Sequence, residues 1–291
     1  MLQNSTVAGM LFLSGIAAGC LGIGGAGTAA VAAGAAAALT IATAAGFMRK
    51  RRATEGLTGF NAILTGCAVF TFLQPMAATW ALLAAAALLT LPLKSVLDRA
   101  FSKTGCSSLT LPFILATWAV LLTAQTAGID PAEPAIAPTV AASAVAIGQG
   151  ALKGLSQIFL IDSWVAGCIF LAGLWAASRR AALLALAGSA AGMAAGYCCG
   201  CPWLEISQGL WGFSPALTAI AVGHTFRDAK AGWLRSAMTV TAAVMLTVVI
   251  QMIAAPALAA AGLPVLTIPF CAATWIMTAV MSFPRRKRPE N

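Results

Sequence analysis

The sequence predicts a polytopic membrane protein built entirely of α-helices. Sixty per cent of the 291 residues are hydrophobic, only 9% are Asp, Glu, Lys or Arg, and long tracts rich in Ala, Gly and Leu recur from end to end. A soluble domain averages roughly 25% charged residues, so this chain has too few charges to cover its surface in water. Helices are expected because a lipid-embedded segment must satisfy its own backbone hydrogen bonds, and the alternating pattern of a β-barrel is absent.

Ten apolar tracts approach the ~20 residues that a helix needs to cross a bilayer. Residues 126–139 are expected to form a loop, because they hold Asp130, Glu133 and several prolines. Residues 140–157 are apolar but short and punctuated by Gly, which suggests a half-helix that enters the membrane and returns. The ten tracts are 5–22, 27–47, 57–73, 76–93, 108–125, 162–178, 181–199, 208–224, 236–260 and 265–283.

The distribution of positive charge supports ten spans. If the N-terminus is cytoplasmic and the spans alternate, 16 of the 17 basic residues fall on the cytoplasmic side and only Lys153 falls outside. Such segregation is typical of topology determinants. The net charge of +9 is therefore interpreted as a topology signal rather than a nucleic-acid surface, and both termini are expected in the cytoplasm of a cell with this protein in its inner membrane.

The chain also contains an internal repeat. Residues 7–18 match 165–176, residues 56–65 match 209–218, and residues 110–118 match 267–275, at offsets of 158, 153 and 157 residues. These blocks keep Phe, Pro, Trp and Gly in register, unlike chance matches between alanine-rich helices. We predict a first repeat over residues 1–130 and a second over 131–291. Five spans per repeat, an odd number, make the second inverted, and inverted repeats place a solute path at their interface near the bilayer midplane.

Three motifs resemble those of the urea transporter family. Leu263–Phe270 has the form L-P-x-x-T-x-P-F, which is the signature of that family. Gly59–Gly66 is similar to the family's G-[YF]-N-G-x-L-x-G block, and Lys153–Phe159 to its R-G-x-x-Q-V-F stretch. The resemblance covers nearly the whole chain.

This resemblance implies a homotrimer in which each subunit has its own pore. Each half supplies a pore half-helix and a broken span, and the pore is a flat slot between aromatic and leucine side chains beside a ladder of oxygen acceptors. Matched by motif, Phe60, Leu64, Phe213 and Leu217 would line the slot, Gln157 would be a ladder acceptor with Ile158 beside it, and Thr110 and Thr267 would place hydroxyls near the constriction.

The chemistry of these residues suits urea, a small, planar, uncharged and polar molecule. Its N–H groups and carbonyl need partners once water is removed, because unmet polar groups cost several kcal/mol. Thr hydroxyls both donate and accept, and several weak sites favour flux over tight binding. Among the acids near the predicted spans, only Asp162 and Glu205 come close. Driven transporters usually keep ionisable groups in the membrane, so passive conduction without ion coupling is expected.

The sequence departs from the family pattern in three places. The first-half counterpart of the octapeptide, Cys106–Phe113, lacks the leading Leu-Pro, and Phe213-Ser214-Pro215 stands where the family has Asn-Gly. The counterpart of Gln157 would fall before Met1, so the first repeat is expected to lack its pore half-helix. A misassigned start, a shortened sequence and an asymmetric pore all remain open.

The same residues also fit other interpretations. The Phe and Leu residues could serve helix packing, the two Thr residues could bond a backbone carbonyl, and Gln157 could be a helix contact. An ammonia channel would need paired histidines, and His224 stands alone. A channel for short-chain amides or other flat neutral solutes and an ion-coupled transporter remain alternatives. No enzymatic activity, cofactor or metal is expected, since Cys198, Cys199 and Cys201 lack a second ligand cluster.

Overall fold

The computed structural model describes residues 5–23, 26–48, 57–102, 106–133, 140–227 and 232–286. Within these residues the regular structure is helical, and extended pairing is limited to one bridge between Leu73 and Pro131. The all-α class predicted from the sequence is thus confirmed.

The helices fall into two consecutive groups. The first group is α1 (Thr6–Ile23), α2 (Ala26–Met48), α3 (Leu57–Phe72), α4 (Ala77–Phe101) and α5 (Leu111–Thr126). The second group is α6 (Ala144–Ser156), the 3-10 turn η2 (Gln157–Phe159), α7 (Trp164–Ala177), α8 (Arg179–Cys198), α9 (Trp203–Ser207), α10 (Phe213–Ile220), the π-helical turn η3 (Ala221–Thr225), α11 (Trp233–Ala259) and α12 (Ile268–Arg286).

Each of the ten predicted tracts coincides with a helix, but two boundaries were wrong. Helix α4 continues beyond residue 93 to Phe101. Lys94 and Asp98 stand one turn apart in this part of the helix and pair with each other, an arrangement that supports a helix. Within the tract 208–224, the helix begins only at Phe213. The residues before it form a turn, in which Gly209 has φ +78°.

The segment 140–157 forms a half-helix that turns sharply. Ser143 caps α6 by accepting a hydrogen bond from the Ala146 N–H at 3.1 Å. After η2 the backbone passes through Leu160 at φ +58°, and α7 leaves at an angle of 76° to the preceding segment. Such a bent pair is the geometry of a broken or re-entrant span.

Among the described helices, α4, α8 and α11 are long and apolar enough to cross a bilayer, and the bent pair of α6 and α7 qualifies as one further span. The other long apolar helices contain shorter described apolar stretches of 10–17 residues. The outer face of α11 exposes Trp233 (81%), Met238 (65%) and Ile253 (68%). Large apolar side chains exposed in this way are suited to a lipid environment.

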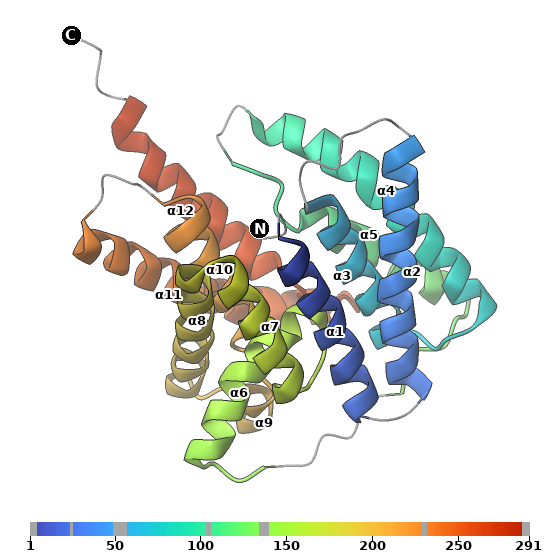
Figure 1. Ribbon diagram of the computed structural model, residues 1–291, viewed down its shortest axis with the longest axis horizontal. Coiled ribbons are helices and arrows are strands. Elements are labelled where there is room, and N and C mark those ends of the chain that lie inside the picture. The colour runs from blue at the N-terminus through green and yellow to red at the C-terminus, as the bar shows by residue number, and fades with distance from the viewer. Residues whose placement is uncertain are drawn as a thin grey trace.

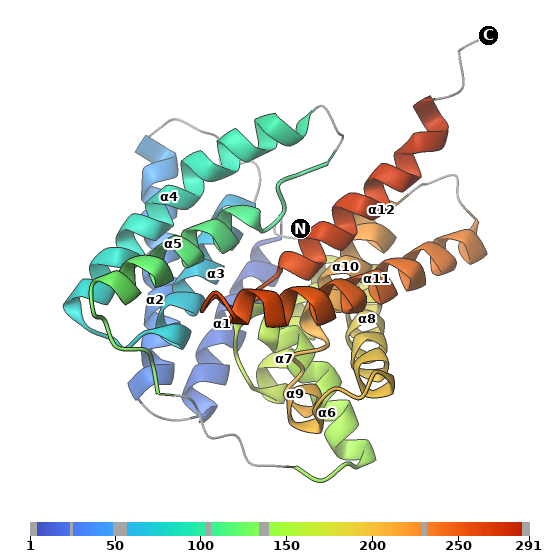
Figure 2. The same ribbon diagram turned by 180° about the vertical axis from the view of Figure 1, so that it is seen from behind.

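The two groups of helices lie side by side (Figures 1 and 2). Helix α1 packs along α7 at the boundary between them, and α5 contacts α12. Inside each group, small residues permit close crossings. A Cβ on Gly66 of α3 would lie 2.4 Å from the carbonyl oxygen of Gly34 in α2, and one on Gly188 of α8 would lie 2.8 Å from the carbonyl oxygen of Pro215 in α10. Small residues at interfaces are typical of helix packing in membranes.

The helix ends are sorted between two sides of the molecule. The ends of α2, α4 and α12 lie toward the top of Figure 1, whereas the end of α1 and the beginning of α6 lie toward the bottom. Basic residues follow the ends of α2, α4 and α12 in the sequence, at 49–52, 103 and 287–288. These residues themselves lie outside the described part of the chain.

Candidate functional site

The turn η2 lies between the two groups of helices and contacts both α3 and α10. Its last residue, Phe159, is buried and meets the ring of Phe60 edge-on, with ring centroids 5.8 Å apart and planes at 88°. Phe159 also contacts Phe170 of α7 at 4.9 Å and Phe12 of α1 at 5.9 Å. The end of the half-helix is therefore anchored in an aromatic cluster drawn from both groups.

The predicted slot residues gather in one buried cluster around this turn. Phe60 and Leu64 come from α3, Ile158 from η2, and Phe213 and Leu217 from α10. All five are at most 9% exposed. The cluster thus contains side chains from α3 and α10 that are more than 150 residues apart in the sequence.

Thr110 and Thr267 meet directly. Their hydroxyl oxygens are 2.8 Å apart, and the Thr110 hydroxyl is also 3.2 Å from the sulfur of Cys271. Both threonines are almost fully buried. The contact joins the segment before α5 to the segment before α12 at equivalent positions of the repeated octapeptide.

Each threonine follows a leucine in the left-handed region. Leu109 has φ +53° and Leu266 has φ +46°. A non-glycine residue in this conformation costs roughly 1–2 kcal/mol, and such strain persists where the surroundings enforce it, often at functional sites. The matched conformations show that both octapeptides adopt the same turn.

Two tryptophans tie these turns together reciprocally. The indole N–H of Trp118 in α5 donates to the carbonyl oxygen of Pro264, and that of Trp275 in α12 donates to the carbonyl oxygen of Ser107, each at 3.0 Å. Each turn is therefore braced by a helix of the other group.

The two turns differ in how their own group supports them. In the first, the Asn61 side chain donates to the Leu109 carbonyl at 3.3 Å and accepts from the Phe113 N–H at 3.1 Å. In the second, Ser214 occupies the corresponding position of the repeat, and its buried hydroxyl makes no hydrogen bond. The departure from the family pattern noted at Ser214 thus leaves a polar group unsatisfied.

Gln157 is partly buried, and its amide nitrogen donates to the carbonyl oxygen of Gln208 at 3.1 Å. This contact orients the amide between the half-helix and the loop that precedes α10. Lys153 and Asp162 form an ion pair at 2.8 Å across the same sharp turn. The pair encloses η2 and holds the two sides of the bend together.

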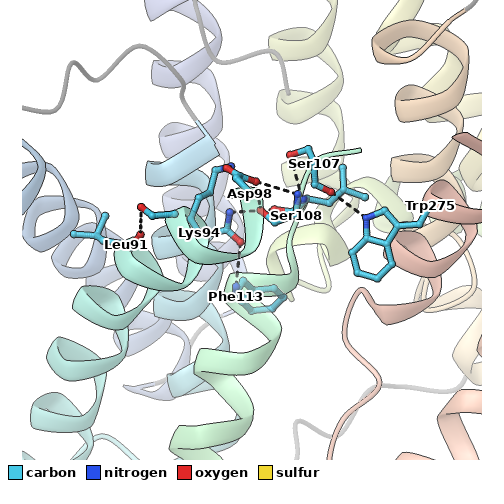
Figure 3. A network of polar contacts seen from close by, with 10 residues as sticks. Leu91, Lys94, Asp98, Ser107, Ser108, Phe113 and Trp275 are labelled. Atoms are coloured by element: carbon cyan, nitrogen blue, oxygen red, sulfur yellow. Dashed lines mark hydrogen bonds and ion pairs between the residues drawn. The ribbon is translucent and has the colours of Figure 1, made fainter. Parts of the chain in front are cut away.

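A polar network lies at the end of α4, in the part of the helix that the predicted span omitted (Figure 3). Lys94 pairs with Asp98, and Asp98 accepts hydrogen bonds from the N–H of Ser108 at 3.0 Å and from its hydroxyl at 2.6 Å. Lys94 is only 6% exposed. Asp98 therefore joins Asp162 and Glu205 among the acidic residues close to the spans.

Several side chains of this site were not expected from the sequence. Phe159, Cys271 and Asp98 were missed, because nothing in their local pattern shows which distant group they contact. Asn61, Trp118 and Trp275 lie inside the repeated blocks, so their register in the repeat was a usable signal. Within the described residues, no three His, Cys, Asp or Glu side chains form a group able to hold a metal ion.

The helical fold, the long apolar helices and the exposed apolar surface define a polytopic α-helical membrane protein. A family described as "Urea transporter" matches residues 1–282. The chain belongs to the urea transporter family, as the three motifs indicated. The description of this family is that of transporters rather than enzymes.

The chain is also similar to individual urea transporters from mammals. The chain is 31% identical over 234 residues to Urea transporter 1 of Ovis aries and, equally, of Capra hircus. It is 30% identical over 232 residues to Urea transporter 1 of Rattus norvegicus. The matches cover 75–76% of this chain, and the chain spans about 60% of the length of these relatives.

Proposed function

We propose that this protein conducts urea passively down its gradient across the cytoplasmic membrane. The observation that carries the proposal is the hydroxyl pair of Thr110 and Thr267, 2.8 Å apart, at the point where the two copies of the family signature meet. Family membership and the names of the relatives identify urea as the solute to test.

In the proposed pathway, two repeats over residues 1–130 and 131–291 enclose the solute route. The reciprocal bonds of Trp118 and Trp275 support a two-fold relation between these repeats. Phe60 and Leu64 on one side and Phe213 and Leu217 on the other form a flat apolar slot. A planar molecule passes such a slot more easily than a rounder one, and ions are excluded because the slot cannot replace their hydration.

Polar groups along the route replace the water that urea gives up. The Thr110 and Thr267 hydroxyls both donate and accept, so they can bond either the carbonyl or the N–H groups of the solute. Gln157 offers an amide at the end of α6, with Ile158 beside it. Since a typical hydrogen bond contributes about 1 kcal/mol net, each exchange is shallow, which favours rapid passage.

Conduction without ion coupling is part of the proposal. Two pairs of charged side chains belong to the segments around the site, Lys94 with Asp98 and Lys153 with Asp162, and each forms an ion pair. A coupling ion or proton would have to break such a pair. Flux is therefore expected to depend on the urea gradient alone.

We further propose a homotrimer in the cell inner membrane, surrounded by lipid, with both termini cytoplasmic. The basic clusters support this orientation through the positive-inside rule. The exposed apolar face of α11 supports contact with lipid or with a neighbouring subunit.

The test is stopped-flow light scattering on proteoliposomes under an inward urea gradient with no ion gradient. Fast, saturable urea entry that is unchanged by added sodium or proton gradients is expected. Faster entry of acetamide or formamide than of urea would instead identify an amide channel. Entry that requires an ion gradient would show a coupled transporter, and absence of flux from folded protein would refute the proposal.

A further inference from the structure

The turn before α5 is held by charged side chains, whereas the equivalent turn before α12 is not. We call Ser107–Thr110 the first constriction turn and Pro264–Thr267 the second. Asp98 bonds both the backbone N–H and the hydroxyl of Ser108, two residues before Thr110, while Lys94 pairs with the same carboxylate (Figure 3). Ser108 is completely buried, whereas the side chain of Asp98 is 36% exposed, so a partly exposed carboxylate holds a buried residue of the turn.

In the described part of the second repeat, the residues at the equivalent positions cannot form this network. At the offset of 157 residues that relates the two turns, Gln251 stands for Lys94, Ala255 for Asp98 and Val265 for Ser108. Gln251 turns elsewhere and donates to the Leu210 carbonyl at 2.9 Å. The second turn instead contains Pro264, whose ring fixes the backbone angle φ.

We infer that Asp98, held by Lys94, is a positioning residue that sets the first constriction turn in the place of the missing Leu-Pro. Both turns must hold a leucine in the left-handed region so that the threonine after it reaches its partner. A conformation of this kind survives only when its surroundings enforce it. Proline does so by restricting the backbone, and the Asp98 carboxylate does so by accepting hydrogen bonds from the N–H and hydroxyl of the buried Ser108.

The transport consequence of this inference rests on the proposed function, but the geometry can be tested without it. Thr110→Cys places a thiol beside native Cys271, since the Thr110 hydroxyl lies 3.2 Å from that sulfur. Oxidation with copper phenanthroline, followed by mass spectrometry of linked peptides, measures how often the two meet. Adding Asp98→Ala should slow this linkage about tenfold, the effect of losing bonds to a charged group. Adding Cys106→Leu with Ser107→Pro, which copies the second turn, should restore it.

Matched controls separate positioning from a general loss of charge or stability. Asp130→Ala removes an exposed acid from a distant loop and should change neither linkage nor melting temperature. Where Asp98→Ala does not fold, Asp98→Asn takes its place, because its amide retains an acceptor for Ser108 but loses the ion pair. It should slow linkage less than the alanine variant would.

Urea flux gives the second readout, in proteins that keep Thr110. Asp98→Ala should lower urea flux about tenfold. Adding Cys106→Leu with Ser107→Pro should restore the flux. Unchanged linkage in Asp98→Ala, or linkage that the Leu-Pro pair does not restore, would overturn the inference. The expected linkage pattern in the Thr110→Cys proteins, together with no urea flux through the folded wild-type protein, would support the inference while refuting the proposed function.

Discussion

The hydroxyls of Thr110 and Thr267 form a hydrogen bond between the first and the second constriction turn. Each is almost fully buried, so the bond forms away from bulk water. In the proposed pathway, a solute that enters replaces this hydroxyl–hydroxyl bond by two bonds to itself. Because the bonds lost and gained are alike in strength, the exchange costs little, and this balance is what a conducting site requires.

Replacing one hydroxyl should impair conduction more than stability. Thr267→Val keeps the side-chain shape but removes a bond of about 1 kcal/mol, which predicts a roughly fivefold slower urea flux in stopped-flow measurements. Thr123→Val is the matched control, since Thr123 is exposed and its hydroxyl donates to the Ala119 carbonyl of its own helix. Equal flux in the wild-type protein and Thr267→Val would remove this threonine from the pathway.

Phe60 should set the size of solute that passes. Phe60→Ala removes a ring that is 9% exposed and that meets Phe159 edge-on, so the slot widens. We expect the ratio of urea to dimethylurea flux to fall in the same liposome assay, together with a loss of about 3 kcal/mol of stability. Leu122→Ala, on an exposed position of α5, should leave the ratio unchanged. A lower stability with an unaltered ratio would assign Phe60 to packing alone.

At the scale of helices, close crossings decide how the groups assemble. Helices α2 and α3 meet at Gly34 and Gly66, and helices α8 and α10 meet around Gly188 and Pro215. The absence of a side chain lets the backbones approach, and dispersion contacts then hold helices that gain nothing from the hydrophobic effect within lipid.

Gly66→Ala should destabilise the α2–α3 crossing. The new methyl group would lie 2.4 Å from the Gly34 carbonyl oxygen, and the backbone must move, at a cost of about 1–3 kcal/mol. A lower melting temperature in detergent is expected. Gly148→Ala in α6 is the control, because its methyl group meets nothing within 4 Å and should stabilise the helix by up to ~1 kcal/mol. Identical shifts in the two variants would contradict the role of the crossing.

At the scale of the whole molecule, orientation in the membrane is the main open prediction. Helix α8 begins at Arg179 and ends at Cys198. The positive-inside rule assigns the beginning to the cytoplasm, so the end and the following Cys199 and Cys201 should face the other side.

Thiol labelling tests this orientation. A membrane-impermeant maleimide should label Cys198 and Cys199, which are exposed, in intact cells. Cys201 should react more slowly, because burial and then the neighbouring Cys199 and Glu205 raise its pKa. Less of the reactive thiolate is then present at neutral pH, and the difference should narrow as the pH rises.

The control for this labelling lies at the other end of α8. Ser178→Cys, beside Arg179, should be labelled only after the cells are made permeable. Labelling of Cys198 and Cys199 that appears only in permeable cells would invert the proposed topology.

The helices themselves were predictable because their signal is local. Apolar length alone located all ten tracts, and Gly punctuation indicated the half-helix at 140–157. The predicted end of α4 was wrong because the apolar tract stops at the charged residue Lys94. In the structure Lys94 pairs with Asp98, and the helix continues through both residues. Composition shows where chain can enter lipid, but it does not show which charges are neutralised within the fold.

The sequence by itself determined the membrane class, the family and the repeated blocks, because these depend on composition and on residues at constant spacing. Only the tertiary structure decided that the Thr110 and Thr267 hydroxyls meet, that Leu109 and Leu266 adopt left-handed turns, and that Asp98 holds Ser108. These contacts join segments whose approach depends on how all the helices pack. A local pattern records which residues repeat, whereas packing determines which of them touch.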